Sequence, residues 1–294
     1  MKVSVLLSVY NESADIKLAV QSVLDQSYKN FELIIIDDQS TDDTLAKVSS
    51  FEDSRIKIFR NPNKGKVNAF NLAYERSVGE LLVLFAGDDF MPHDSLSKRV
   101  FAFEQRESVA SHVIQCGHLK TVSRETRLDG LVIPRHKFGN FTGGVIMFNR
   151  DFGERAFPIP TSLPNEDTWL EITAKFTDVQ ILKSPGIVLH YQIHDKNSSG
   201  GRYGFSRARS AFFERMNAFE VFYDRVGSTS SMQVSASLQR YITAIRLFEA
   251  GDFIRGFLCF GVPLSFKLRL LLHSSANLFF IRQKLFRFLV GRLR

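Results

Sequence analysis

The chain has 294 residues, 44% of them hydrophobic and 23% charged, which excludes a disordered or fibrous protein and allows one or two globular domains. Its formal charge of +7 would favour nucleic acid as a partner if it were spread over the surface. The eight Lys and Arg residues after Phe253, with no acid among them, account for it, so the rest carries a charge of −1 and nucleic acid is not expected. These cations are Arg255, Lys267, Arg269, Arg282, Lys284, Arg287, Arg292 and Arg294.

Several features of the sequence indicate a cytoplasmic protein. Cys116 and Cys259 match no metal-binding or redox spacing, which fits a reducing compartment. The sequence opens on a strand-like run and shows no signal-peptide pattern. No apolar span reaches the roughly 18 residues of a transmembrane helix.

The first ninety residues alternate between strand-like and helix-like patterns. This alternation predicts a doubly wound, Rossmann-like α/β domain. Ser40 and Asp43 form a capping-box pattern at the start of the second helix. The expected strands are Val3–Tyr10, Phe31–Ile36, Ile56–Phe59 and Leu81–Ala86, and the expected helices are Ile16–Leu24, Thr41–Ser50 and Asn68–Val78.

Two of these strands end in adjacent acids. Asp37 and Asp38 follow the second strand, and Asp88 and Asp89 follow the fourth. Because ligands bind beyond the carboxyl ends of parallel strands, this edge is expected to hold a cation or a sugar-nucleotide hydroxyl. Four like charges also need a cation or hydrogen-bond donors to offset their repulsion. The alternative is that each pair caps a helix, which explains one pair better than both.

The loop after the first strand lacks the spaced glycines of a dinucleotide-binding protein. Tyr10, Asn11 and Glu12 stand there instead, which argues against a dehydrogenase. The Walker lysine motif is absent as well. Lys64 and Lys66, just before the predicted helix, are candidates for holding phosphate, although loop lysines are more often only solvated. Asn68, where that helix begins, is a further candidate for nucleotide binding.

The middle of the chain adds further candidate residues. Two glycines in Phe141–Phe148 allow close approach to the backbone. Glu166 and Asp167 precede a helical pattern, where capping and the helix dipole alone would explain two acids. His194 lies in the loop His190–Ser199 together with Lys196 and Asn197, and Gly200 and Gly201 follow; this segment is a candidate lid.

From Phe205 onward the apolar spacing is helical, so we expect a domain over residues 1–204 and a helical extension over residues 205–294. Near the C-terminus Leu285, Phe286, Phe288 and Leu289 interleave with cations. A basic amphipathic segment of this kind is typical of binding to an anionic membrane surface. The alternative is ordinary helices with solvated arginines.

Four segments, in order along the chain, together resemble a known family. SVLLSVYNE with SVLDQSY and FELIIIDDQSTDDT is similar to the N-terminal signature of the inverting GT-A glycosyltransferases commonly called family 2. GELLVLFAGDDFMP resembles the family's metal-binding DxD segment, NEDTWL its catalytic motif and HYQIHDKNSS its histidine loop. The resemblance covers about two thirds of the chain and implies a GT-A fold and a Mg²⁺ or Mn²⁺ cofactor.

The resemblance also implies roles for individual residues. Tyr10 corresponds to the aromatic residue that stacks on the nucleotide base, above the loop of Asn11 and Glu12. Asp38 corresponds to the acid that contacts the base, and the role of its neighbour Asp37 is left open. The remaining roles are metal binding for Asp88, with Asp89 beside it, catalytic base for Asp167 supported by Glu166, and metal or diphosphate binding for His194.

Two positions depart from the family pattern. Ala86 stands where the first acid of the DxD triplet is expected, and Phe70 stands where many relatives have arginine before the residue that is Asn71 here. The first departure weakens the metal assignment without removing Asp88. The second puts contacts from that helix to the base or phosphate in doubt.

The predicted function is that of a metal-dependent inverting glycosyltransferase. It would move a sugar, with UDP-sugar as the first choice of donor, to a hydroxyl of a lipid-linked glycan acceptor in surface polysaccharide synthesis, at the inner face of the cell membrane. A catalytically degenerate scaffold that binds nucleotide sugar or glycolipid remains an alternative because of Ala86. A nucleotidyltransferase would need a glycine-rich phosphate loop near the N-terminus, and none is present.

Overall fold

The computed structural model describes residues 1–106, 110–133, 141–193, 204–226 and 231–282. Contacts divide the chain into two compact units. The first comprises residues 1–124 and 128–193, and the second contains the helices from Phe205 onward. Each unit is described separately below.

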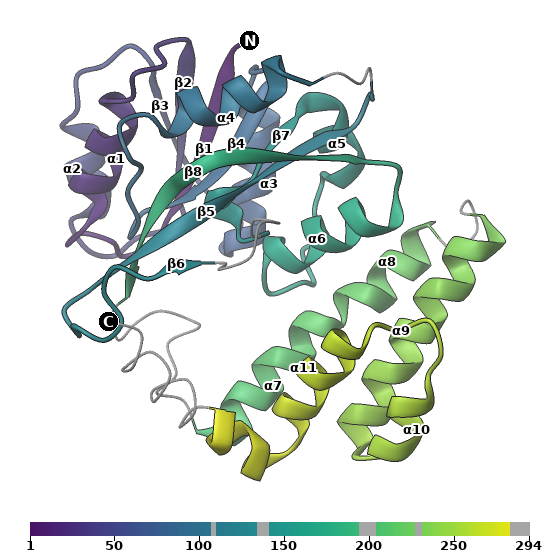
Figure 1. Ribbon diagram of the computed structural model, residues 1–294. Coiled ribbons are helices and arrows are strands. Elements are labelled where there is room, and N and C mark those ends of the chain that lie inside the picture. The colour runs from purple at the N-terminus through teal and green to yellow at the C-terminus, as the bar shows by residue number, and fades with distance from the viewer. Residues whose placement is uncertain (107–109, 134–140, 194–203, 227–230, 283–294) are drawn as a thin grey trace. The chain divides into compact units, whose positions relative to one another are not determined.

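The first unit is built on one mixed sheet with the strand order β3-β2-β1-β4-β7-β5-β6, in which β8 lies beside β5 (Figure 1). Strands β3, β2, β1 and β4 are parallel, and β7 runs antiparallel to both β4 and β5. The strands are β1 (Val3–Val9), β2 (Phe31–Asp37), β3 (Ile56–Arg60), β4 (Leu81–Ala86), β5 (Val113–Ser123), β6 (Val132–Ile133), β7 (Met147–Asn149) and β8 (Gln180–Ile193). The predicted α/β fold with a mixed sheet is confirmed.

The central strands are apolar on both faces because helices and loops cover the sheet on both sides. Every residue of β2 is buried, and β1 and β4 each have only one that is not. Helix α1 presents the predicted stripe of Ile16, Ala19, Val20 and Val23 to this core. The helices of the unit are α1 (Ile16–Leu24), α2 (Thr44–Ser49), α3 (Lys66–Arg76), α4 (Ser95–Glu104), η1 (Gly143–Val145, a 3₁₀ turn), α5 (Arg150–Ala156) and α6 (Glu166–Phe176).

Several predicted boundaries are wrong. Helix α2 begins at Thr44 rather than Thr41, because the Ser40 hydroxyl accepts a hydrogen bond from the Asn11 N–H instead of capping the helix. Helix α3 begins and ends two residues earlier than predicted, at Lys66 and Arg76. His190 lies inside β8 and not in a loop, because its backbone pairs with that of Phe90.

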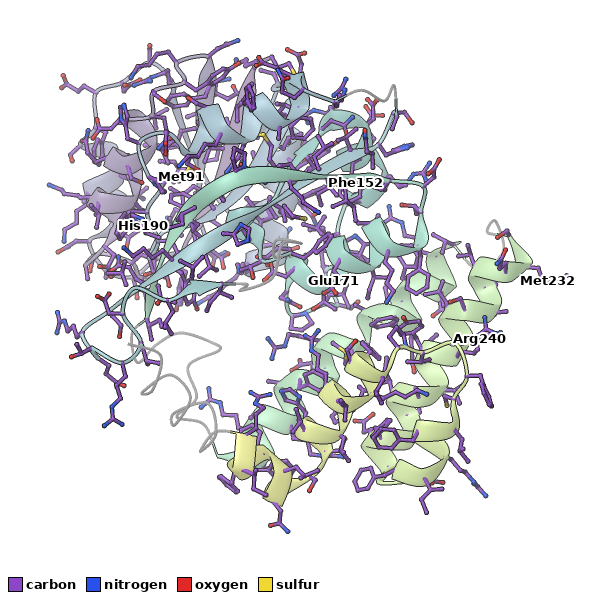
Figure 2. All side chains as sticks on the ribbon, in the orientation of Figure 1. Met91, Phe152, Glu171, His190, Met232 and Arg240 are labelled. Atoms are coloured by element: carbon purple, nitrogen blue, oxygen red, sulfur yellow. The ribbon has the colours of Figure 1, made fainter. Side chains whose placement is uncertain are left out.

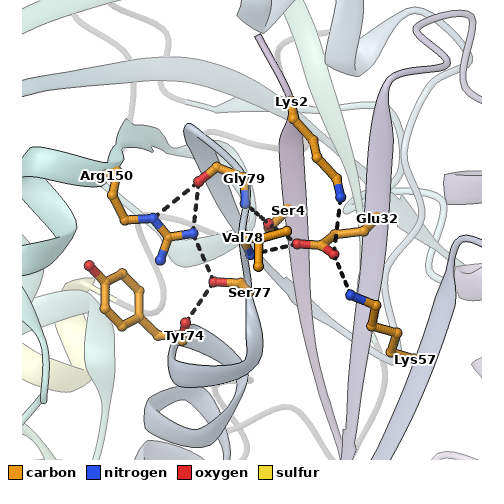
Figure 3. A network of polar contacts seen from close by, with 9 residues as sticks. All are labelled: Lys2, Ser4, Glu32, Lys57, Tyr74, Ser77, Val78, Gly79 and Arg150. Carbon is orange, nitrogen blue, oxygen red and sulfur yellow. Dashed lines mark hydrogen bonds and ion pairs between the residues drawn. The ribbon is translucent and has the colours of Figure 1, made fainter.

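The edge of the sheet where β1, β2 and β4 begin holds a network of buried polar groups (Figure 3). The Glu32 carboxylate accepts hydrogen bonds from the Ser4 hydroxyl at 2.6 Å and the Val78 N–H at 2.7 Å. It also pairs with Lys57 at 3.0 Å and Lys2 at 3.5 Å. Burial raises the pKa of Glu32, but these donors and cations lower it by more, to about 2.

Arg150, the first residue of α5, closes the same edge directly after the antiparallel strand β7. Its guanidinium donates to the Gly79 carbonyl at 2.7 and 3.1 Å and to the Ser77 hydroxyl at 3.1 Å (Figure 3). Gly79 has room only for hydrogen, since a Cβ there would lie 2.5 Å from the Ser4 hydroxyl oxygen. This edge is therefore filled by structural contacts, and a ligand site is expected at the opposite edge.

The second unit is helical, as predicted. Its core is aromatic: Phe219 stacks on Tyr241 with ring centroids 5.4 Å apart, and Phe212 stacks on His273 at 3.8 Å. The helices with bounds inside the described ranges are α7 (Phe205–Met216), α8 (Ala218–Val226), α9 (Met232–Ala250), α10 (Phe253–Leu258) and α11 (Leu264–Ser274). None of the helices in the described ranges has the length and apolarity needed to span a bilayer.

Candidate active site at the carboxyl edge of the sheet

The loops that follow β1 and β2 are joined by hydrogen bonds. Asn11 adopts a positive φ of 54°, its N–H donates to the Ser40 hydroxyl at 3.1 Å and its side-chain oxygen accepts from the Thr41 N–H at 2.8 Å. The Glu12 N–H donates to the Thr44 hydroxyl at 2.8 Å. These bonds fix the loop that carries Tyr10 at the carboxyl edge.

The acid pair at the end of β2, with Asp37 as the last residue of the strand and Asp38 just after it, is buried and organises the next loop. The Asp38 carboxylate accepts from the Asn61 amide at 2.7 Å and from the Gly65 N–H at 2.8 Å. Asp37 accepts from the Ser40 N–H at 3.2 Å through Oδ1, whereas its Oδ2 is buried and has no hydrogen-bond partner within the described ranges. Asp38 thus holds the turn that leads into α3, and Asp37 retains an acceptor oxygen.

This turn presents Lys64 to Tyr10. The Lys64 ammonium donates to the Tyr10 hydroxyl at 2.9 Å and lies 4.1 Å from the centre of the ring. The Asn68 amide in turn donates to the Lys64 carbonyl at 3.1 Å. Tyr10 is 41% exposed, so a large aromatic face lies open at the carboxyl edge of the sheet.

The ammonium of Lys66, the first residue of α3, interacts with acids of two other segments. Its ammonium lies 2.8 Å from Glu166 Oε1 at the start of α6. Burial lowers the pKa of Lys66, but the nearby carboxylates of Glu166, Asp167 and Asp88 raise it by more, so the net shift is upward. Because Gly65 binds Asp38 and the next residue, Lys66, pairs with Glu166, contacts link the end of β2 to the start of α6, and the charge of Asp88 after β4 acts on the same ammonium.

Asp167 is oriented by the backbone of η1. The Gly143 N–H donates to Asp167 Oδ1 at 2.6 Å. A Cβ on Gly143 would lie 2.9 Å from this oxygen and 3.2 Å from Glu166 Oε1, and one on Gly144 would lie 2.7 Å from Leu189 Cδ2. The two glycines therefore permit close approach to the backbone, as predicted. The second oxygen of Glu166 is buried and has no hydrogen-bond partner among the residues described.

The acid pair after β4 joins that strand to β8. Asp89 is buried and accepts from the Gln192 N–H at 3.0 Å, next to the backbone pair between Phe90 and His190. Burial, followed by the charge of Asp88, holds the pKa of Asp89 well above its usual range. Glu12 lies over the same turn, since a Cβ on Gly87 would be 3.1 Å from its Cγ.

A divalent cation is compatible with these residues only if the ligand supplies most of the coordination. Within the described ranges, no three His, Cys, Asp or Glu side chains form a metal site by themselves. Mg²⁺ commonly takes one or two carboxylates plus substrate phosphates, an arrangement that Asp88 fits. His194, Lys196 and Asn197, the other predicted ligand and lid residues, lie outside the described residues.

Sequence reasoning missed four residues that hold this site together. Asn61 and Gly65 bind Asp38, and the turn-rich sequence NPNKGK gave only a hint of it. Asn71 binds the backbone N–H and C=O of Ile159, each at 2.8 Å, while Phe70 beside it is buried, so this part of α3 faces protein. Arg99 is fully buried, and nothing in an arginine on a helix predicts that.

Comparison with known proteins identifies a family and relatives for part of the chain. The family model described as "Glycosyl transferase family 2" matches residues 4–158. An uncharacterised glycosyltransferase of Haemophilus influenzae is 31% identical over 140 residues, which cover 45% of this chain and 56% of that protein. The Escherichia coli UDP-Glc:alpha-D-GlcNAc-diphosphoundecaprenol beta-1,3-glucosyltransferase WfgD is 36% identical over 99 residues, 33% of this chain and 39% of that one. The matches thus span about half or less of these relatives.

Solved structures share the fold over nearly the whole chain. The S. aureus TarS fragment 1-349 in complex with UDP-GlcNAc has a TM-score of 0.60 at 17% identity and covers 97% of this chain and 92% of that one. The mannosyltransferase PcManGT from Pyrobaculum calidifontis in complex with GDP-Man and Mn2+ has a TM-score of 0.55 at 15% identity and covers 95% and 87%. The GT-A fold expected from the sequence is confirmed.

Proposed function

The chain belongs to glycosyl transferase family 2, and from this premise we propose that it moves a sugar from a UDP-sugar to a hydroxyl of a lipid-linked glycan acceptor, with inversion at the anomeric carbon. The observation that carries the proposal is the ion pair of Lys66 with Glu166, close enough to Asp167 and Asp88 for their charges to act on the same ammonium, since it joins a cation for a diphosphate to carboxylates for a hydroxyl.

The nucleotide would bind over the loops after β1 and β2. Tyr10 offers its exposed face to the base. The Asp37–Asp38 pair offers acceptor oxygens to a base N–H, and Asp37 Oδ2, which has no hydrogen-bond partner within the described ranges, supports this role. Lys64, beside Tyr10, and Lys66 offer positive charge to the diphosphate. Support for uridine comes from WfgD, whose name specifies UDP-Glc, and from the TarS complex with UDP-GlcNAc.

The carboxylates account for the transfer step. Asp167 would take the proton of the acceptor hydroxyl while that oxygen attacks the anomeric carbon from the face opposite the diphosphate. The bond from the anomeric carbon to the diphosphate oxygen breaks, and its electron pair leaves with UDP. Lys66, held by Glu166, would stabilise the charge that develops on the leaving group. A single protein carboxylate then acts on the acceptor, unlike the carboxylate pair of a glycosidase.

Asp88 would hold a Mg²⁺ or Mn²⁺ ion together with the phosphates of the donor, and Asp89 would keep the Asp88 turn fixed through its bond to β8. Bound there, the ion supplies positive charge that stabilises the departing diphosphate. PcManGT, of the same fold, is described in complex with Mn2+. Ala86 leaves the DxD triplet one acid short, so the proposal assigns the protein's share of the coordination to Asp88.

The acceptor would be carried by a membrane that the second unit binds. Helices α10 and α11 and the segment between them expose large apolar side chains: Ile254, Leu258, Phe260, Leu264 and Leu268 are 78%, 64%, 86%, 63% and 44% exposed. Arg255 and Arg269 are exposed on the same helices, and no acid follows Asp252. Apolar side chains flanked by cations suit an anionic lipid surface. WfgD, whose acceptor is named as a diphosphoundecaprenol lipid, supports this acceptor class.

A transfer assay tests the proposal, with UDP-glucose as donor and GlcNAc-diphosphoundecaprenol as acceptor. We expect a glycosylated lipid product, loss of transfer with EDTA, and recovery with Mg²⁺ or Mn²⁺. In parallel, UDP-, GDP- and dTDP-sugars are compared by thermal unfolding, in which a ligand at about 100 times its Kd adds about 2.7 kcal/mol of stability.

The outcomes of these assays distinguish an active transferase from a degenerate scaffold, and they test the metal assignment and the donor assignment separately. Stabilisation by UDP-sugars without transfer to any lipid-linked or free glycan acceptor would favour the degenerate scaffold. Full transfer in EDTA would contradict the metal assignment. Absence of stabilisation by every UDP-sugar would contradict the donor assignment.

A further inference from the structure

Arg99, on α4, is a buried cation that has no acid partner among the residues described. Its side chain is fully buried, and burial alone lowers the pKa of its guanidinium to about 9. Among the described residues its partners are three backbone carbonyls and the hydroxyl of Ser95, one turn earlier in the helix. A buried charge without an opposite charge beside it lowers the stability of the fold, so packing alone does not explain an arginine at this position.

The carbonyls that Arg99 binds belong to segments around the candidate active site. Its guanidinium donates to the Gly144 carbonyl at 2.6 Å and to the Ile146 carbonyl at 3.0 Å, on either side of the end of η1. It also donates to the Val188 carbonyl of β8 at 3.2 Å, which the Ser95 hydroxyl binds as well at 2.6 Å. One planar group therefore ties η1 to α4 and β8.

The residue held next to these carbonyls is Gly143, whose N–H donates to Asp167 at 2.6 Å. The Gly143 N–H and the Gly144 carbonyl belong to consecutive residues of η1, so a displacement of η1 moves both. No side chain at Gly143 or Gly144 braces the turn, and Arg99 supplies a rigid fork in place of one.

We propose that Arg99 is a positioning residue for the transfer reaction: it fixes η1 and thereby the N–H that holds the Asp167 carboxylate toward the acceptor. This inference rests on the proposed function for the role of Asp167. The mechanical part, that Arg99 holds η1, stands on the contacts alone. Misplacing a reacting group by about 1 Å can cost a hundredfold in rate, so a modest release of η1 has a measurable effect.

The test compares Arg99→Met and Arg99→Lys with Arg150→Met in the full-length protein. Arg150 is the matched control, because it also donates to backbone carbonyl and hydroxyl oxygens from a partly buried position but lies at the opposite edge of the sheet. We expect Arg99→Met to lower kcat by about 10- to 100-fold with KM for UDP-glucose within twofold of wild type. Arg99→Lys keeps the positive charge but lacks the planar guanidinium, so its kcat is expected to lie between those of Arg99→Met and wild type.

Two further measurements separate positioning from general destabilisation. Hydrogen exchange of a peptide spanning residues 141–147 is expected to become faster in Arg99→Met and to stay unchanged in Arg150→Met, whichever substrates the enzyme uses. In an Asp167→Asn background, Arg99→Met should lower kcat no further, since its effect passes through Asp167.

Unchanged exchange of the 141–147 peptide in both Arg99 variants would overturn the inference. So would equal losses of kcat from Arg99→Met and Arg150→Met, or an undiminished loss in the Asp167→Asn background. By contrast, an Asp167→Asn variant that retains full kcat would contradict the proposed function, whereas faster exchange in Arg99→Met would still support the hold of Arg99 on η1.

Discussion

At the scale of single residues, Glu32 predicts how stability depends on pH. Its folded pKa of about 2 lies below the ordinary value of 4.5, so its ionised form stabilises the fold fully above about pH 4.5. This stabilisation is lost as pH falls from 4.5 towards 2. Glu32→Gln is expected to cost about 1–3 kcal/mol at pH 7, because buried donors lose a charged acceptor, and to flatten the stability curve in this window.

Urea unfolding of both proteins between pH 2 and pH 7 checks this prediction. Glu75→Gln is the matched control, since Glu75 is 68% exposed and pairs only loosely with Arg76 at 3.7 Å. The Glu32→Gln and wild-type curves should converge at low pH while the control follows wild type. Parallel curves for Glu32→Gln and wild type would contradict the assignment.

Gly143 makes a second prediction at the residue scale. A methyl group there would meet the carboxylate oxygens of Asp167 and Glu166 at 2.9 and 3.2 Å. Gly143→Ala should therefore push both carboxylates away and lower kcat about tenfold or more, with UDP affinity within twofold of wild type. Gly204→Ala is the control, because its Cβ would meet nothing within 4 Å. Equal kcat values for Gly143→Ala and Gly204→Ala would contradict the claim that the Asp167 and Glu166 carboxylates lie against Gly143.

At the scale of elements, the sequence predicted the strands and helices that are determined by the residues within them. Long apolar runs became β1, β2 and β4 because both faces of these strands are buried. The start of α2 was mispredicted because the Ser40 hydroxyl accepts a hydrogen bond from the Asn11 N–H in the loop after β1. A contact between two distant loops cannot be predicted from the sequence around Ser40. The full length of β8 was missed because, apart from Ser184, Val188 and Leu189, the residues of this strand are exposed or half-buried, so no long apolar run marks it.

Helices α10 and α11 carry the prediction for membrane binding. Replacing both Phe260 and Leu264 by Ser should weaken binding to phosphatidylglycerol vesicles about tenfold or more, since burial of each apolar side chain contributes about 1.5–3 kcal/mol. Met232→Ser is the control. Met232, labelled in Figure 2, is the first residue of α9, is 89% exposed and precedes the acid-free segment after Asp252. Sedimentation with vesicles gives the partition coefficients.

Binding of wild type should also be weaker to phosphatidylcholine vesicles and in high salt, because the cations of the segment are screened or lack anionic partners. Equal partitioning of the Phe260/Leu264 variant and wild type would contradict the assignment of this surface. A loss in Met232→Ser of the same size would do so as well.

At the scale of the whole molecule, the sequence predicted that the candidate acids would share one edge of the sheet, because parallel strands bring their carboxyl ends to one edge. It did not predict the contacts that unite the site. The meeting of Lys66 with Glu166 joins residues a hundred positions apart, and the hold of Asp38 on Gly65 depends on a loop conformation. Arg99 could not be found, since an arginine on a helix ordinarily indicates a solvated face.

The central claim is that Asp167 takes the acceptor proton, and turnover by Asp167→Asn tests it most directly. The variant is measured with UDP-glucose and GlcNAc-diphosphoundecaprenol, alongside UDP-glucose binding by calorimetry. The proposed mechanism predicts that kcat falls about a hundredfold or more while donor affinity stays within twofold of wild type. Wild-type kcat in Asp167→Asn, with donor binding intact, would contradict it.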